Sequence, residues 1–385
     1  MITGYKIINE DFGNLFIPRV LFSDAGLWSW GQSNNGQLGD NTVVNKSSPV
    51  QTVAGGNNWK LISSGGYQIK SGIKTDGTLW NWGDNASGQL GDNSRTNRSS
   101  PVQTVAGGTN WKYVACGTLY TAAIKTDGTL WLWGRNNYGQ LGVSPVSASA
   151  VSSPVILFSY NDWKFVTAGG NHLAAIKTDG TLWTWGYALN GQLGNNAVTN
   201  RSSPVQTVAG GNNWKSVAAG AWYTVGIKTD GTLWLWGDNA YGQLGDNSIT
   251  KRSSPVQTTT GGTNWKFVEC GYGHTMGIKT DGTLWTWGQN DLGALGDNTT
   301  ARRSSPVQTV SGGTNWKSAA GGLYNTGCIK TDGTLWTWGW NTYGQLGDNS
   351  ITSRSSPVQT VAAGTNWKYV SGGHHTMMAT KDDNF

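Results

Sequence analysis

One string of eleven residues, I-K-T-D-G-T-L-W-T-W-G, stands letter for letter at residues 176–186, 278–288 and 329–339, and close variants recur elsewhere. The first Trp of each W-x-W-G aligns in seven copies that lie 51 or 52 residues apart: Trp28, Trp80, Trp131, Trp183, Trp234, Trp285 and Trp336. The marker N/D-W-K also recurs seven times, at Trp59, Trp111, Trp163, Trp214, Trp265, Trp316 and Trp367. A repeat of this length predicts one array of equivalent units instead of separate domains.

Each copy predicts four short strands. Apolar residues alternate in W-K-F-V-E-C-G, and H-T-M-G-I-K leads into T-D-G-T, where Asp-Gly favours a tight hairpin turn. The strand L-W-T-W-G follows. The run S-S-P-V then begins a fourth strand at an edge, because Pro cannot donate a hydrogen bond to a neighbouring strand. Four strands in about 50 residues match one blade of a β-propeller.

The two ends of the chain complement each other. The repeats open with F-S-D-A-G-L-W-S-W-G and close with H-T-M-M-A-T-K-D-D, so each end holds the part of a blade that the other lacks. We expect residues 27–31 to complete the sheet begun by residues 367–382, which would close a ring of seven blades and remove exposed sheet edges. The expected organisation is a non-repeat N-terminal segment, residues 1–20, followed by an all-β seven-bladed propeller, residues 21–385.

The combination D-G-T-L-W-x-W-G-x-N-x-x-G-Q-L-G, followed in some copies by G-x-x-H-T, resembles the repeat of the regulator of chromosome condensation family, in the style of its phage or bacterial members. The resemblance covers about residues 21–383 and implies a seven-bladed propeller. At the family's His position we place His172, His274 and His375, with Ile69, Tyr120, Tyr223 and Asn325 in the other copies. The family's namesake implies nucleotide exchange on a small GTPase and chromatin binding. The sequence argues against both functions, because it has no long basic tail and no loop insertion that departs from the repeat length.

The residue types that catalysis needs are scarce. Charged residues make up 12% of the chain, and the two glutamates are Glu10 and Glu269. The Asp of the K-T-D-G turns is explained by turn geometry, and the adjacent His374 and His375 have no clear third ligand for a metal. We therefore expect no enzymatic activity, no cofactor and no metal. The odd number of cysteines indicates buried thiols in place of a disulfide framework.

Function should depend on positions that differ between copies. One variable zone follows each W-x-W-G, as at residues 135–138, 187–190, 238–241 and 340–343. The other follows the Gly after N-W-K and is rich in aromatic and His side chains, which propeller symmetry should bring into a ring: Tyr67, Tyr120, His172, Trp222, Tyr223, Tyr272, His274, Tyr324, His374 and His375. Such a ring could stack on sugars or anchor a protein partner. The alternative is that these side chains pack between blades.

A basic residue precedes S-S-P in six of the seven copies, and we expect these residues to form a basic rim: Lys46, Arg98, Arg201, Arg252, Arg303 and Arg354. With a net charge of +6, the rim could attract a polyanion such as a nucleic acid or an acidic polysaccharide. Aspartates in the same loops, such as Asp92 and Asp246, could instead neutralise it.

The first 20 residues are too apolar for a free tail, which predicts that they pack on the propeller or dock elsewhere as an anchor. They lack the features of a secretory signal, and no stretch is long and apolar enough to span a bilayer, so we expect cytoplasmic synthesis. The sequence favours a non-enzymatic structural or attachment protein of a virus (phage) particle that binds other proteins or surface glycans. The alternatives are a soluble protein-binding propeller, similar to the bacterial propellers that inhibit β-lactamases, and a lectin-like propeller.

Overall fold

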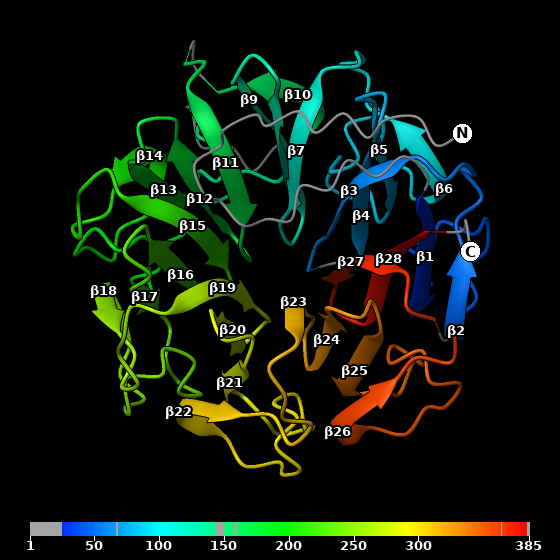
Figure 1. Ribbon diagram of the computed structural model, residues 1–385. Coiled ribbons are helices and arrows are strands. Elements are labelled where there is room, and N and C mark those ends of the chain that lie inside the picture. Colours follow the sequence, from blue (N-terminus) through cyan, green and yellow to red (C-terminus); the bar gives the residue numbers. More distant parts are fainter. Residues whose placement is uncertain (1–24, 67, 144–149, 158–159, 363, 383–385) are drawn as a thin grey trace, which may run out of the picture.

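The computed structural model describes residues 25–66, 68–143, 150–157, 160–362 and 364–382. These residues form seven four-stranded antiparallel sheets, arranged as blades around a central axis (Figure 1). Residues 1–20, which we expected to be a non-repeat segment that packs on the propeller or docks elsewhere as an anchor, lie outside the described residues. In the described part of the chain, no helix is long and apolar enough to cross a membrane.

Each blade runs from an inner strand at the axis to an outer strand at the perimeter. The inner strands are β3 (Trp59–Ser64), β7 (Trp111–Cys116), β11 (Trp163–Ala168), β15 (Trp214–Ala219), β19 (Trp265–Cys270), β23 (Trp316–Gly321) and β27 (Trp367–Gly372). The second strands are β4 (Ile69–Lys74), β8 (Tyr120–Lys125), β12 (His172–Lys177), β16 (Tyr223–Lys228), β20 (His274–Lys279), β24 (Asn325–Lys330) and β28 (Thr376–Asp382).

The third strands carry W-x-W-G: β1 (Ala25–Gly31), β5 (Leu79–Gly83), β9 (Leu130–Gly134), β13 (Leu182–Gly186), β17 (Leu233–Gly237), β21 (Leu284–Gly288) and β25 (Leu335–Gly339). The outer strands carry S-S-P-V: β2 (Lys46–Gln51), β6 (Arg98–Gln103), β10 (Val151–Ile156), β14 (Arg201–Gln206), β18 (Arg252–Gln257), β22 (Arg303–Gln308) and β26 (Arg354–Gln359). We number the closing blade, β27-β28-β1-β2, as blade 1, and β3–β6 to β23–β26 as blades 2 to 7.

The predicted ring closure is confirmed. β1 pairs with β28 in antiparallel register, with Trp28 opposite Ala379. The N-terminal part also supplies the outer strand β2, so each end of the chain contributes two strands to blade 1. Separating the two ends of the chain would therefore break a complete sheet.

The repeated string builds one structure in each blade. In blade 5, the carboxylate of Asp230 accepts a hydrogen bond from the backbone N–H of Thr232 (2.9 Å). The Thr232 hydroxyl in turn accepts one from the indole N–H of Trp234 (2.9 Å). The ammonium of Lys228 lies 5.0 Å from the ring centroid of Trp214 and 5.2 Å from that of Trp234, in cation–π contact with both. Four letters of the string, the Lys, the Asp, the second Thr and the first Trp, therefore have a structural role in the turn that they build.

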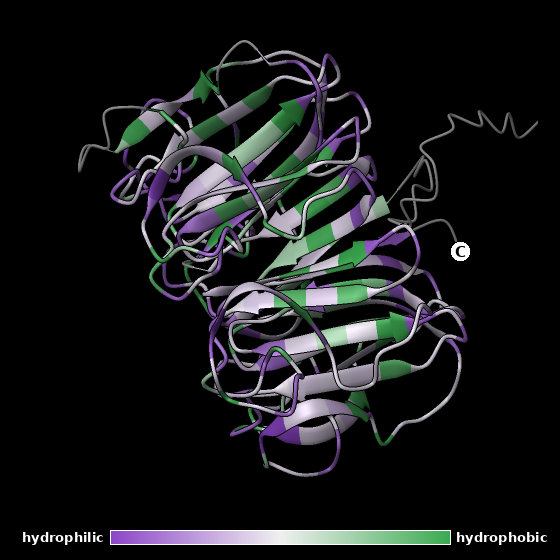
Figure 2. Cartoon of the chain, turned by 90° about the vertical axis from the view of Figure 1, so that its left-hand side faces the viewer, coloured by the Kyte–Doolittle hydropathy of each residue, from purple (hydrophilic) through white to green (hydrophobic). Residues whose placement is uncertain are grey.

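Neighbouring blades are joined by contacts of the same kind around the ring. The indole N–H of the buried Trp236 donates to the carbonyl of Gln192 in the preceding blade (2.9 Å). The turn residue Gly231 adopts φ +81°, and a Cβ added there would lie 2.0 Å from the carbonyl oxygen of Thr263 in the next blade, so only glycine fits. Hydrophobic and hydrophilic bands alternate along the strands in Figure 2, because successive side chains point to opposite faces of each sheet. The core therefore lies between blades as much as within them.

Candidate binding surface

Two loops of each blade meet at the same end of the propeller. In blade 4, His172 at the start of β12 pairs with Gly186 at the end of β13. The residue before His172 and the residue after Gly186 are therefore neighbours, and the backbone N–H of Tyr187 donates to the carbonyl of Asn171 (2.9 Å). Both variable zones of the repeat lie at this end, which we call the arc face.

Nine half-buried rings follow one another across the arc face, and we call them the aromatic arc: Tyr138, Tyr187, Trp222, Tyr272, Tyr324, Trp340, Tyr343, His374 and His375. They come from blades 3 to 7 and blade 1. Six of the seven blades therefore contribute to one surface. The sequence grouped only five of the nine with the predicted ring, since the other four lie in the variable zone that follows W-x-W-G.

Ring contacts make the arc continuous. The centroid of Tyr187 lies 4.9 Å from that of Tyr138 and 5.3 Å from that of Trp222. The indole N–H of Trp222 donates to the hydroxyl of Tyr272 (3.4 Å), which begins the second half of the arc, and the Tyr272 centroid lies 6.5 Å from that of Tyr324. Most of these contacts are edge-to-face, the geometry that aromatic quadrupoles favour.

The other half of the arc gathers around Trp340. Its ring centroid lies 5.8 Å from that of Tyr324 and 4.8 Å from that of His375. Burial lowers the pKa of His374 to about 4, assisted by the neighbouring His375 and Lys70. Burial and Lys70 likewise lower the pKa of His375 to about 4. Both imidazoles are therefore neutral near pH 7, and the arc presents flat rings with polar edges and no charge.

Four residues of the predicted ring do not reach this surface. Tyr120, His172, Tyr223 and His274 are fully buried, so their interpretation as surface ligands is wrong and packing between blades is their role. The Tyr120 hydroxyl donates to the carbonyl of His172 in the next blade (2.6 Å). His172 Nε2 lies 2.8 Å from the Thr224 hydroxyl one blade further. Tyr67 lies outside the described residues.

The seventh His position also needs correction. Thr376 pairs with Gly31 in the same way that His172 pairs with Gly186, so Thr376 occupies the equivalent position in blade 1. His375 stands one residue earlier. That offset places its ring in the arc instead of between two blades.

The predicted basic rim is largely neutralised. The rim residues lie at the arc end of the outer strands, since Arg252 pairs with Gly237 at the end of β17. Arg252 donates twice to the same carboxylate oxygen of Asp246 (2.9 and 2.7 Å), and similar pairs hold Lys46, Arg98, Arg303 and Arg354. Arg201 is exposed and forms no ion pair with a described residue, because Asn195 stands where the five copies with paired rim residues have Asp. Five cations paired with Asp, and one without an acidic partner among the described residues, make a weak site for a polyanion.

The Asp and Cys side chains that the sequence singled out have structural places. Among the described residues, no group of three or more His, Cys, Asp or Glu side chains is placed to hold a metal ion. The Asp of each K-T-D-G turn lies at the other end of the blade and binds its own turn. Cys116, Cys270 and Cys328 are free and buried, which confirms their interpretation as buried thiols.

Family models match most of the described chain. The RCC1-like domain model matches residues 164–385, and the regulator of chromosome condensation (RCC1) repeat matches residues 24–69, 76–124 and 127–176. The ultraviolet-B receptor UVR8 of Arabidopsis thaliana is 30% identical over 353 residues, which is 88% of this chain and 78% of the receptor. The human E3 ubiquitin-protein ligase HERC2 is 29% identical over 351 residues, and this chain spans 7% of its length.

Solved structures share the fold at low sequence identity. Human WBSCR16 superposes with a TM-score of 0.82 at 20% identity, covering 94% of this chain and all of that one. Prp20p of Saccharomyces cerevisiae superposes with a TM-score of 0.81 at 18% identity, covering 93% of this chain and 91% of Prp20p. Membership of a phage or bacterial branch stays a prediction. By its repeats, its seven blades and these relatives, the chain belongs to the regulator of chromosome condensation (RCC1) family.

Proposed function

We propose that this protein is a non-enzymatic binding propeller that holds a protein partner against the aromatic arc. The observation that carries the proposal is the arc itself: nine uncharged rings in continuous contact on one face, at positions where the copies differ. Tyr and Trp bring a large contact area and lose little conformational entropy on binding, which is why they dominate the energetics of protein interfaces.

The rigidity of the support favours the same function. Each arc residue stands on a loop whose two ends are strands paired within a closed ring, as Tyr187 is held by the backbone hydrogen bond to Asn171. A surface that is ordered before binding loses less conformational entropy on association. Related propellers bind proteins. Prp20p was studied for binding to Gsp1p and histones, and yeast RCC1 was solved bound to Kap60.

The test compares an arc variant with a matched variant on the opposite end. The arc variant carries Trp222→Ala and Trp340→Ala. The control carries Val310→Ala, which removes an exposed apolar side chain beyond the far end of β22. Proteins retained by the immobilised wild type are identified by mass spectrometry and purified, and their Kd is measured against all three forms.

We expect the arc variant to bind the purified partner at least about 100-fold more weakly, since two interface aromatics of this kind contribute roughly 3 kcal/mol together. The control should bind like the wild type. Equal affinity of all three forms would rule out the arc as the binding surface. Retention of glycans in place of proteins would change the partner class to the lectin-like alternative.

We further propose that the propeller serves in a larger assembly, as a structural or attachment component of a virus particle. The near-identical copies, the low charge and the apolar residues 1–20 support this form of the proposal. Light scattering on the full chain and on a chain starting at Leu21 tests the anchor. An assembly lost on truncation supports it, and absence of the protein from purified particles by mass spectrometry contradicts the particle role.

A further inference from the structure

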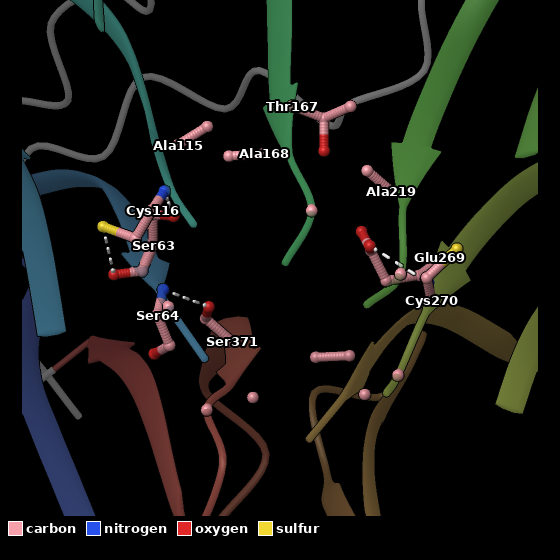
Figure 3. A pocket seen from close by; sticks show the side chains of 18 of the residues that line it. Ser63, Ser64, Ala115, Cys116, Thr167, Ala168, Ala219, Glu269, Cys270 and Ser371 are labelled. Carbon is pink, nitrogen blue, oxygen red and sulfur yellow. Dashed lines mark hydrogen bonds between the residues drawn. The ribbon is translucent and has the colours of Figure 1, made fainter. Parts of the chain in front are cut away.

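The seven inner strands enclose a cavity of about 310 Å³ on the propeller axis (Figure 3). Small side chains and glycine make up most of its middle section, as at Ala115, Ala168 and Gly321. The volume lies at the lower end of the range of small-molecule pockets, about 300–1,000 Å³. The cavity is therefore large enough for a compact ligand.

One side chain breaks the pattern of this wall. The fifth residue of the inner strand is Glu269 in β19, whereas the other six inner strands place Ser63, Ala115, Thr167, Ala218, Ala320 and Ser371 there. Figure 3 shows the Glu269 side chain extending from β19 into the cavity. Among the described residues that line the cavity, Glu269 is the one acid.

The Glu269 carboxylate has little compensation from the protein. Its Oε1 accepts a hydrogen bond from the backbone N–H of Cys270 (3.1 Å), and no described Lys or Arg forms an ion pair with it. Burial accordingly raises the pKa of this carboxyl to about 7. Desolvation of a partly buried carboxylate without a cation costs free energy, and a cationic ligand would offset that cost. The other copies of the repeat cannot attract a cation in this way, because they have uncharged residues at this position.

The wall opposite Glu269 carries hydroxyls (Figure 3). The Ser371 hydroxyl accepts a hydrogen bond from the backbone N–H of Ser64 (3.0 Å), and the Ser63 hydroxyl accepts one from the backbone N–H of Cys116 (3.0 Å). The Ser64 hydroxyl is buried and forms no hydrogen bond with another described residue. A ligand in the cavity thus meets a carboxylate on one side and the wall that carries the Ser63 and Ser371 hydroxyls on the other.

Lys70 lies behind Gly373 and Cys116 on the opposite wall, where burial lowers its pKa to about 7. The other described charged groups of the lining lie away from this level of the cavity. Lys215 and Lys266 line it near the start of the inner strands, and Lys266 precedes Glu269 by three residues, roughly 10 Å along an extended strand. His374 lines the end that opens on the arc face, where it is neutral near pH 7. The negative charge in the middle of the cavity is therefore carried by Glu269.

We propose that the cavity binds a primary ammonium or guanidinium group, whose N–H donors contact the Glu269 carboxylate. The opposite hydroxyl of Ser371 takes up a remaining hydrogen bond. This chemistry has two sources, a free small amine and an Arg side chain of a partner segment. The rest of the wall selects for small size, because its side chains and glycines are short.

Isothermal titration calorimetry at pH 8, where Glu269 is ionised, tests the proposal with two probes. Agmatine represents a free amine, and N-acetyl-arginine amide represents an Arg side chain. Glu269→Gln keeps the shape and removes the charge, and it should fold, because six blades already hold an uncharged residue at this position. Asp291→Asn makes the same charge change at an exposed ion pair with Arg302, outside the cavity.

We expect at least one probe to bind the wild type and Asp291→Asn equally, and to bind Glu269→Gln at least tenfold more weakly. Binding of agmatine assigns the site to free amines, and binding of the arginine amide alone assigns it to a partner side chain. Binding that Glu269→Gln leaves unchanged, or no binding of either probe to the wild type, overturns the proposal. Thermal unfolding of each variant, followed by circular dichroism, verifies that all three forms are folded.

Discussion

The two ends of each blade differ in how much the copies vary. At the hairpin end, a Lys lies between two Trp rings in each of the six uninterrupted copies, from Lys74 in blade 2 to Lys330 in blade 7. At the arc end, equivalent positions hold Trp222 in one blade and Gly273 in the next. The residues at the hairpin end are therefore restricted by the packing of the ring, and the residues at the arc end can differ to suit a partner.

The largest effect that tests this comparison comes from replacing one Trp buried between blades and one Trp of the arc. Trp185 is fully buried, and its indole N–H donates to the carbonyl of Gln140 in the preceding blade (3.0 Å). We expect Trp185→Ala to lower the free energy of unfolding by about 3–5 kcal/mol. Trp222→Ala, at the half-buried Trp of the arc, should lower the free energy of unfolding by less than about 1 kcal/mol. Chemical denaturation followed by circular dichroism measures both, and similar losses would show that the arc is structural.

The buried His positions sharpen the comparison through pH. Burial lowers the pKa of His172 to about 3, below its ordinary 6.5, so its neutral form is stable in the fold and its charged form is not. Stability is present above pH 6.5 and is lost as pH falls toward about 3. We expect His172→Tyr, which copies the residue of blades 3 and 5, to recover on the order of 3 kcal/mol at pH 4 and little at pH 7, because at pH 4 the unfolded chain protonates His172 and the fold does not. Thermal unfolding at both pH values measures the difference, and equal effects at pH 4 and 7 would refute it.

The Lys between two Trp rings predicts a smaller effect. Lys228→Met keeps the aliphatic stem and removes the charge, so we expect a loss of about 1 kcal/mol. The control is Lys251→Met, since Lys251 is exposed and makes no cation–π contact with a described ring. Urea denaturation should distinguish the two variants. An equal effect at both sites would mean that the ring contacts of Lys228 contribute nothing measurable.

The rim predicts the smallest effect. Arg252→Ala breaks the ion pair with Asp246 and should cost up to about 1 kcal/mol, less at high salt. Arg201→Ala, at the rim position without an acidic partner, should be neutral. Thermal unfolding at low and high salt measures both. A greater loss for Arg201→Ala would contradict the pairing that the structure shows.

The sequence was sufficient for the fold because its signals are local and repeated seven times. W-x-W-G, the Asp-Gly turn and the split copies at the two ends determine strand, hairpin and closure. The candidate binding surface was only partly predictable, because the exposure of each side chain depends on the register of its strand. His375 and Thr376 differ by one residue, and that step separates a ring in the arc from a side chain between blades.

Charge was harder to predict than register. Asp246 and Arg252 are six residues apart, and only the folded loop shows that they neutralise each other. The sequence marks Glu269 in one way, because an acid stands at a position where the other copies have Ser, Ala or Thr. Its direction into the axial cavity follows from the inner position of β19, which the sequence alone did not assign.

The most direct test of the separation between repeated architecture and variable function is one variant measured in two ways. Trp222→Ser, Tyr272→Ser, Tyr324→Ser and Trp340→Ser are combined, and unfolding and partner retention are measured on the same preparation. We predict that the variant unfolds within a few degrees of the wild type and retains none of its partner. A large loss of stability, or partner binding that survives all four changes, would contradict the account.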